Sequence, residues 1–124
     1  MTISEVSQKY GLSQDTLRYY EKAGMIPPVH RTLGGLRDYT DEDCGWVELA
    51  KCMRSAGVQV EAIAEYVRLA QQGDKTLADR CQLLKEQRVQ LAGQLQSIEA
   101  AMERLDYKIS RYEEAVKTGV LHWD

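Results

Sequence analysis

Apolar residues recur every three or four positions over most of the first 71 residues, which predicts a series of amphipathic helices. Two short helices are expected over residues 2–10 and 13–23, each starting at a Thr or Ser cap and ending at a glycine. Longer helices are expected over residues 40–56 and 60–71. Two short helices joined by a turn that holds a glycine form the outline of a helix-turn-helix.

The segment between the second and third helices has an extended pattern instead. Pro27 and Pro28 block a helix, and two short runs flank Gly34 and Gly35. This pattern predicts a small hairpin, which would form a wing beside the helix-turn-helix.

From about residue 76 onward the apolar residues follow a heptad pattern. Its twelve seam positions are Leu77, Cys81, Leu84, Arg88, Leu91, Leu95, Ile98, Met102, Leu105, Ile109, Tyr112 and Val116. Only Arg88 breaks the apolar seam. A helix of this extent is about 60 Å long, too long for the preceding residues to cover its stripe, so it needs a partner helix. A second copy of the chain is the expected partner, and an internal hairpin broken at Gly93 is the alternative. The heptads alone do not decide between parallel and antiparallel pairing.

The net charge of −3 excludes a generic polyanion binder. Residues 1–40 nevertheless carry five Lys or Arg against four acids, a net charge of +1. Any nucleic-acid binding must therefore come from the placement of a few cations.

The three cysteines, Cys44, Cys52 and Cys81, form no C-x-x-C pair. Their number and spacing argue against a disulfide framework and against a zinc ribbon, and they fit a reducing compartment. No apolar run approaches the roughly 18 residues of a membrane span, and the amino terminus lacks a signal-peptide pattern. We therefore expect a cytoplasmic protein with no membrane partner, no cofactor and no metal.

Cations and hydroxyls share one face of the second predicted helix. Arg18, Tyr19 and Lys22 lie opposite the apolar face, together with Asp15. Such a stripe suits phosphate oxygens and base edges in a major groove, and the hairpin offers Arg31, Arg37 and Tyr39 as a second clamp. The alternative is an ordinary solvated face.

Two long segments closely resemble the winged-helix DNA-binding head of MerR-type bacterial transcription regulators. They are "TISEVSQKYGLSQDTLRYYEKAGMI" and "HRTLGGLRDYTDEDCGWVELAKCMRSAGVQVEAIAEYV", and the match runs over roughly residues 1–70. The resemblance implies a mainly α fold with a winged helix-turn-helix head over residues 1–72. It also implies a dimerisation helix over residues 76–118, paired as an antiparallel coiled coil, and a short tail over residues 119–124.

The resemblance implies a function as well. The expected partners are a second copy of the chain, a pseudo-palindromic double-stranded promoter and RNA polymerase at that promoter. Distortion of an overlong-spaced promoter would let the polymerase engage both of its elements. Motif position and the shared helix face together give the expected DNA-binding residues Ser13, Thr16, Arg18, Tyr19, Lys22, Arg37 and Tyr39.

A narrower resemblance concerns the signal. The segments "WVELAKCMRSAG" and "GDKTLADRCQLLKEQR" look like the AdhR and NmlR group of small MerR-type regulators, which respond to aldehydes, related electrophiles or nitrosative stress. In that group the cysteine matching Cys52 is regarded as the sensing thiol. Lys51 and Arg54 flank Cys52 in the sequence but point about 100° and 200° away from it on a helix, so they do not activate it.

The residues leave other interpretations open. Cys81 has Lys85 four positions on and is favoured by local electrostatics as the more acidic thiol, but its seam position predicts burial in a dimer. A metal-responsive regulator that uses Cys81 and a coiled-coil module for protein interaction remain alternatives. An enzyme is not expected, because a thiol redox enzyme would need a resolving cysteine or a residue that holds the nucleophile.

Overall fold

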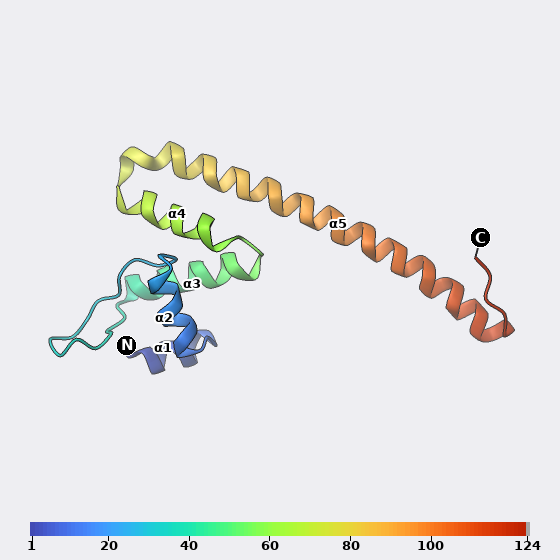
Figure 1. Cartoon of the computed structure of the whole chain (residues 1–124), viewed down its shortest axis with the longest axis horizontal. Coiled ribbons are helices and arrows are strands. Elements are labelled where there is room, and N and C mark those ends of the chain that lie inside the picture. Colours follow the sequence, from blue (N-terminus) through green and yellow to red (C-terminus); the bar gives the residue numbers. More distant parts are fainter. Residues whose placement is uncertain (124) are drawn as a thin grey trace. The chain divides into compact units, whose positions relative to one another are not determined.

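Five α-helices and one short 3-10 helix make up the regular structure of residues 1–123, which the computed structural model describes (Figure 1). They are α1 (Ile3–Tyr10), α2 (Gln14–Lys22), α3 (Asp41–Ser55), α4 (Val60–Gln71), η1 (Asp74–Thr76) and α5 (Leu77–Thr118). The mainly α fold class is confirmed. The chain divides into two compact units, residues 1–88 and the residues from Val89 onward.

The helix ends follow from local chemistry. Thr2 and Glu5 form a capping box at α1, in which each side chain accepts a hydrogen bond from the other residue's backbone N–H. Gly11 ends α1 with a φ of 65°, a left-handed conformation that glycine adopts without steric cost. Thr40 and Asp43 form a second capping box at α3. These local signals explain why the predicted helices over residues 1–71 match the observed ones closely.

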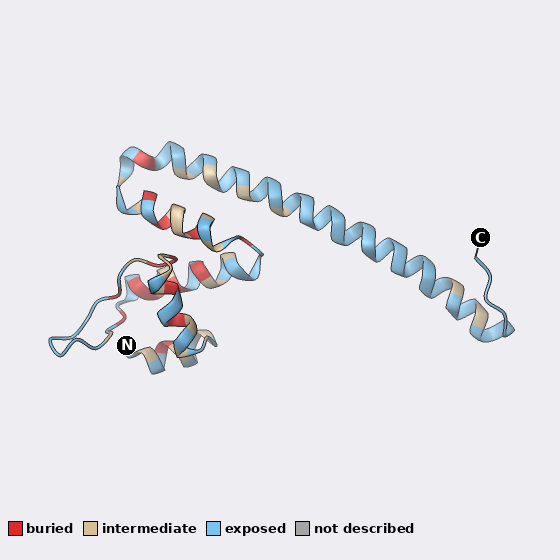
Figure 2. Ribbon diagram, viewed as in Figure 1, coloured by how far each residue is buried: buried red, intermediate tan, exposed pale blue. Residues whose placement is uncertain are grey.

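Helices α1 to α4 enclose the core of the first unit, where most of the buried residues in Figure 2 lie. Among the most deeply buried side chains are Val6 of α1, Leu17 of α2, Val47 of α3 and Ile63 of α4. Met25 and Ile26, which follow α2, join them. One apolar face of each helix therefore fixes α1 and α2 against the longer pair α3 and α4.

The expected hairpin is reduced to a loop over residues 30–38 with a single antiparallel bridge between Arg31 and Arg37. Its turn is closed by Thr32 N–H donating to the Leu36 carbonyl at 2.8 Å and Gly35 N–H donating to the Thr32 carbonyl at 2.9 Å. No strand forms in residues 1–123, so the hairpin is present only as a turn closed by this one bridge. The runs on either side of the turn are short, and an isolated two-stranded ribbon is at best marginally stable. We call this loop the wing loop.

The turn from α4 to α5 is held by side chains within the first unit. The hydroxyl of Thr76, a buried residue, lies 2.6 Å from the Leu69 carbonyl and 2.8 Å from the Gly73 carbonyl. Arg80 donates to the Thr76 hydroxyl at 3.1 Å and to the Gly73 carbonyl at 3.0 Å. These bonds satisfy carbonyl groups at the end of α4 and fix where α5 begins.

Helix α5 has no buried residue along its whole length (Figure 2). Its apolar seam is exposed, with Leu95 and Ile98 at 56% and 57% of their full accessible area. Large apolar side chains exposed in a row are a sign of an interaction surface. None of the helices in residues 1–123 is both long and apolar enough to cross a membrane.

Candidate nucleic-acid interface

Helix α2 presents the side chains expected of a recognition helix. Ser13 caps it by accepting from the Thr16 N–H at 3.0 Å, and its own hydroxyl donates to the Thr16 hydroxyl at 2.8 Å. Arg18, Tyr19 and Lys22 are exposed on the outer face. Because Leu17 and Tyr20 are buried on the inner face, these three side chains are held outward.

The wing loop is attached to α2 through Glu21. Arg37 Nε donates to Glu21 Oε1 at 2.9 Å, and Arg31 Nη2 lies 3.8 Å from the same oxygen. The second carboxylate oxygen, Oε2, accepts from the Val29 N–H at 2.8 Å. One side chain of α2 therefore binds both sides of the wing loop.

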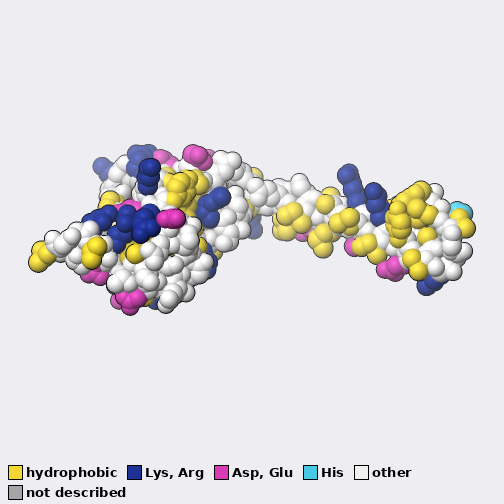
Figure 3. Space-filling model, turned by 60° about the horizontal axis from the view of Figure 1, so that its bottom comes forward, with side chains coloured by type: hydrophobic (Ala, Val, Ile, Leu, Met, Phe, Trp, Pro, Cys, Tyr) yellow, Lys and Arg dark blue, Asp and Glu magenta, His cyan; other side chains and the backbone are white. Residues whose placement is uncertain are grey.

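Arginines from both elements meet in a cleft of about 260 Å³. Arg18 of α2 and Arg31 and Arg37 of the wing loop line it, together with residues from the start of α1 and the tip of the loop. In Figure 3 Lys and Arg side chains gather on the head next to the projecting loop. Guanidinium groups bind phosphate oxygens bidentately, so this cleft, which we call the arginine cleft, suits the backbone of a nucleic acid.

The base of the wing loop is fixed to α3 by a histidine and an aspartate. His30 Nδ1 lies 2.9 Å from Asp43 Oδ2, which also accepts from the backbone N–H groups of His30 and Thr40. The hydrogen bond and charge of Asp43 raise the pKa of His30. Burial alone would raise the pKa of Asp43, but the hydrogen bonds from Thr40 and His30 outweigh it and lower that pKa. The pair therefore favours a charged carboxylate and a protonated imidazole.

Tyr39, expected on the wing, is buried in this structure. Its side chain is 2% exposed, and burial raises the pKa of its hydroxyl. Its backbone accepts a hydrogen bond from the amino group of Met1 and donates one to the Met1 carbonyl. In this structure Tyr39 is a core residue, and a DNA contact at this position stays a prediction.

The three cysteines lie in different surroundings. Cys44 is buried, whereas Cys52 on α3 and Cys81 on α5 are exposed. Lys51 donates from its ammonium group to the Tyr10 carbonyl, and Arg54 donates to the Val58 carbonyl at 2.8 Å. Both cations beside Cys52 are therefore engaged with backbone oxygens. No cluster of three or more His, Cys, Asp or Glu residues suited to a metal occurs within residues 1–123.

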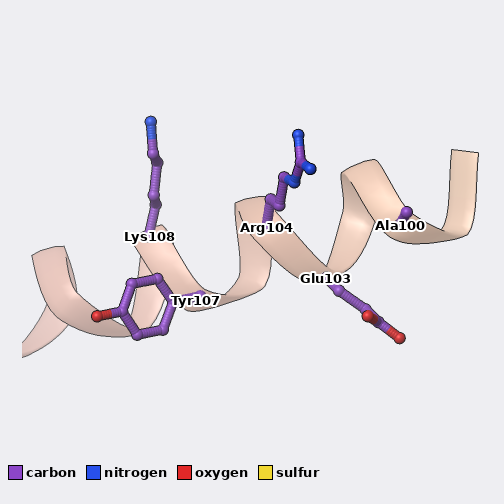
Figure 4. Close-up of a pocket in the computed structure, with 5 residues that line it drawn as sticks. All are labelled: Ala100, Glu103, Arg104, Tyr107 and Lys108. Atoms are coloured by element: carbon purple, nitrogen blue, oxygen red, sulfur yellow. The ribbon is translucent and has the colours of Figure 1, made fainter. Parts of the chain in front are cut away.

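A second cleft, of about 510 Å³, lies along α5 and is lined by Ala100, Glu103, Arg104, Tyr107 and Lys108 (Figure 4). All five residues come from one helix, and in Figure 4 Arg104 and Lys108 point to the same side, away from Glu103. A surface formed by one helix cannot enclose a ligand on its own. We therefore assign no ligand to it.

Sequence reasoning missed the role of Glu21. It found the cations of the arginine cleft but not the carboxylate between them. A usable signal was present, because Glu21 follows the buried Leu17 by four residues and so lies at the inner edge of α2. An acid at that edge needs a partner, and the nearby wing loop supplies two arginines.

A capped helix-turn-helix, an outward-facing recognition helix and an arginine-lined wing define a DNA-binding transcription regulator. The family model described as MerR HTH family regulatory protein matches residues 1–70. The chain belongs to the MerR family. It is a transcription regulator, not an enzyme.

Similar proteins support the narrower resemblance to the AdhR and NmlR group. The chain is 47% identical over 91 residues to the HTH-type transcriptional regulator AdhR of Bacillus subtilis (strain 168). That match covers 73% of this chain and 65% of AdhR, slightly less than two thirds of the relative's length.

Two solved structures are similar over most of the chain. A MerR family transcriptional regulator from Listeria monocytogenes is 40% identical, with a TM-score of 0.90 over 96% of this chain and 90% of that one. HiNmlR, a MerR family regulator lacking the sensor domain and bound to promoter DNA, is 30% identical, with a TM-score of 0.84. That match covers 95% of this chain and 94% of HiNmlR.

Proposed function

We propose that the chain is a homodimeric, cytoplasmic regulator that binds and distorts a pseudo-palindromic promoter, and that thiol-reactive electrophiles act on it through Cys52. The arginine cleft is the observation that carries the DNA-binding part. It offers cations from α2 and from the wing loop to one stretch of phosphate backbone. The similarity to HiNmlR, which is bound to promoter DNA, supports the same interpretation.

Among the expected contacts, Arg18, Tyr19 and Lys22 are exposed on α2 and suit the major groove. Ser13 and Thr16 lie at the start of α2, where their hydroxyls already bind each other. Arg37 contributes through the arginine cleft. The distortion of the promoter, and the engagement of both its elements by RNA polymerase, require enough backbone contacts to offset the cost of deforming the duplex, which is several kcal/mol.

The exposed seam of α5 supports the homodimer. Its spacing reads the same in both directions, so an antiparallel copy matches every seam residue with another about a two-fold axis between residues 96 and 97. The pairs are Leu77 with Val116, Cys81 with Tyr112, Leu84 with Ile109, Arg88 with Leu105, Leu91 with Met102 and Leu95 with Ile98. A C2 dimer requires such self-complementarity. The two heads of the dimer would then bind the two halves of a palindromic site.

Exposure supports Cys52 as the sensing thiol over the other cysteines. Cys44 is buried, and the proposed seam would cover Cys81. Cys52 lies on α3 next to Lys51, whose side chain binds the end of α1. A bulky or polar modification of Cys52 would disturb the contact between α3 and the helix-turn-helix.

A salt titration of promoter binding tests the DNA-binding part. A labelled duplex that covers the promoter of the chain's own gene is expected to bind with an affinity that falls steeply as salt is raised, because bound cations release counterions. Arg31→Gln and Arg37→Gln should each weaken binding and flatten the dependence on salt. Lys75→Gln, a change outside the arginine cleft, is the matched control. Absent or salt-independent binding by the wild type would refute the proposal.

A further inference from the structure

We propose that Glu21 is a positioning residue that holds the wing arginines beside the recognition helix, so that loss of its negative charge weakens DNA binding. This inference rests on the proposed DNA-binding function. The direction of the change in DNA affinity is informative, because Glu21 is an acid on the DNA-binding side of the head.

The geometry joins two elements through one carboxylate. Oε1 accepts from Arg37 at 2.9 Å and lies 3.8 Å from Arg31, while Oε2 accepts from the Val29 N–H at 2.8 Å. Arg31 and Arg37 form the single bridge of the wing loop. Because that loop has so little pairing of its own, Glu21 is its principal attachment to α2.

The contact leaves Arg37 able to bind something else. Arg37 uses Nε for Glu21, and its two terminal nitrogens make no hydrogen bond within residues 1–123. An arginine in solvent samples many rotamers, and that freedom must be lost when it binds a phosphate. The side chain of Glu21 is 14% exposed and that of Arg37 is 23% exposed, so the ion pair is well shielded from solvent. It therefore holds the guanidinium of Arg37 in place before a phosphate binds.

Two opposite expectations follow for Glu21→Gln. If only net charge mattered, removal of an acid near the phosphate backbone would strengthen binding. If Glu21 positions the wing, the same change weakens it. Glutamine is nearly isosteric and can still accept from the Val29 N–H, so the substitution removes the ion pairing and keeps that backbone bond.

The experiment measures binding of the full chain to the labelled promoter duplex and to a random duplex of equal length, by fluorescence anisotropy at several salt concentrations. Glu21→Gln is expected to bind both duplexes about tenfold more weakly, with a slope of log K against log[salt] that is flatter by about 0.9, the value of one phosphate contact. Glu21→Asp, which keeps the charge, is expected to recover part of the loss. Glu61→Gln is the matched control, because Glu61 is an exposed acid of α4 that lies outside the arginine cleft. It should bind as well as the wild type or better.

A double-mutant cycle separates positioning from a general loss of stability. In an Arg37→Gln background, Glu21→Gln should cost less than in the wild type, because the nearer of its two arginine partners is gone and only Arg31, at 3.8 Å, remains. Thermal melts of each variant show whether the head is folded at the temperature of the assay.

Equal or tighter binding by Glu21→Gln overturns the inference alone, as does an equal loss in both backgrounds. Absence of binding by the wild type to either duplex overturns the proposed function, and the inference with it.

Discussion

The exposed seam of α5 gives a prediction whose size follows from the structure. Leu95 and Ile98 lie on either side of the proposed two-fold axis and are 56% and 57% exposed in the single chain. Full burial of a Leu or Ile side chain contributes about 1.5–3 kcal/mol, so covering the exposed half contributes about 1 kcal/mol for each. Each side chain occurs twice in a homodimer. Leu95→Ala combined with Ile98→Ala should therefore weaken dimerisation by about 4 kcal/mol, or roughly a thousandfold in Kd.

Sedimentation equilibrium over a range of concentrations measures that change. Val89→Ala is the matched control, because Val89 is 70% exposed on α5 but lies outside the seam. A wild type that stays monomeric at all concentrations would refute the argument, and so would an equal loss of dimer from the control. An unchanged Kd for the double variant would show that the seam is not the interface.

The orientation of the pairing has its own test, by disulfide formation in a chain whose exposed cysteines are replaced. Antiparallel pairing places residue 84 next to residue 109 of the partner and about 37 Å from residue 84 of the partner. Leu84→Cys alone should not cross-link, whereas Leu84→Cys with Ile109→Cys should. Efficient cross-linking by the single variant would indicate parallel helices.

Three further predictions concern the first unit, residues 1–88. The pKa of His30 is raised, so the stability that its protonated form contributes is full at low pH and is lost as the pH rises through the pKa of His30 in the folded protein. The pKa of Asp43 is lowered, so the stability that its carboxylate contributes is lost as the pH falls through the pKa of Asp43 in the folded protein. Thermal melts at a series of pH values should therefore show the largest loss of stability for Asp43→Asn between the pKa of Asp43 and the pKa of His30. A loss that is the same at every pH would refute this dependence. Thr76→Val should lower the free energy of unfolding by about 1–2 kcal/mol, since it removes a buried hydroxyl that bonds the Leu69 carbonyl and accepts from Arg80; an unchanged melting temperature would contradict this. Cys52→Ala should abolish induction by aldehydes or nitrosating agents in cells while promoter binding persists, and Cys81→Ala should stay inducible; a fully inducible Cys52→Ala strain would show that the thiol is not the sensor.

The predicted helices agree with the structure because their signals are local. The capping box of Thr2 and Glu5 and the left-handed Gly11 depend only on neighbours in the chain. The wing holds only one antiparallel bridge and no strand, because two such short runs supply little pairing energy of their own.

The candidate interface also has a part that the sequence predicted and a part that it did not. The outward face of α2 was predictable from helical spacing once Leu17 and Tyr20 were assigned to the core. The burial of Tyr39 was not, because it depends on how the chain after the wing loop packs beneath the head. Only the structure shows that Lys51 and Arg54, which flank Cys52 in the sequence, bind backbone carbonyls.

By itself the sequence determined the helices, the exposed seam of α5, the family and the cations available for DNA, because periodicity, caps and motif order are properties of the chain alone. Only the tertiary structure decided that Arg18, Arg31 and Arg37 share one cleft and that Glu21 links the recognition helix to the wing loop. Those contacts join residues up to about twenty positions apart across a loop with almost no regular pairing. Their geometry is fixed by packing of the whole head, and no local pattern encodes it.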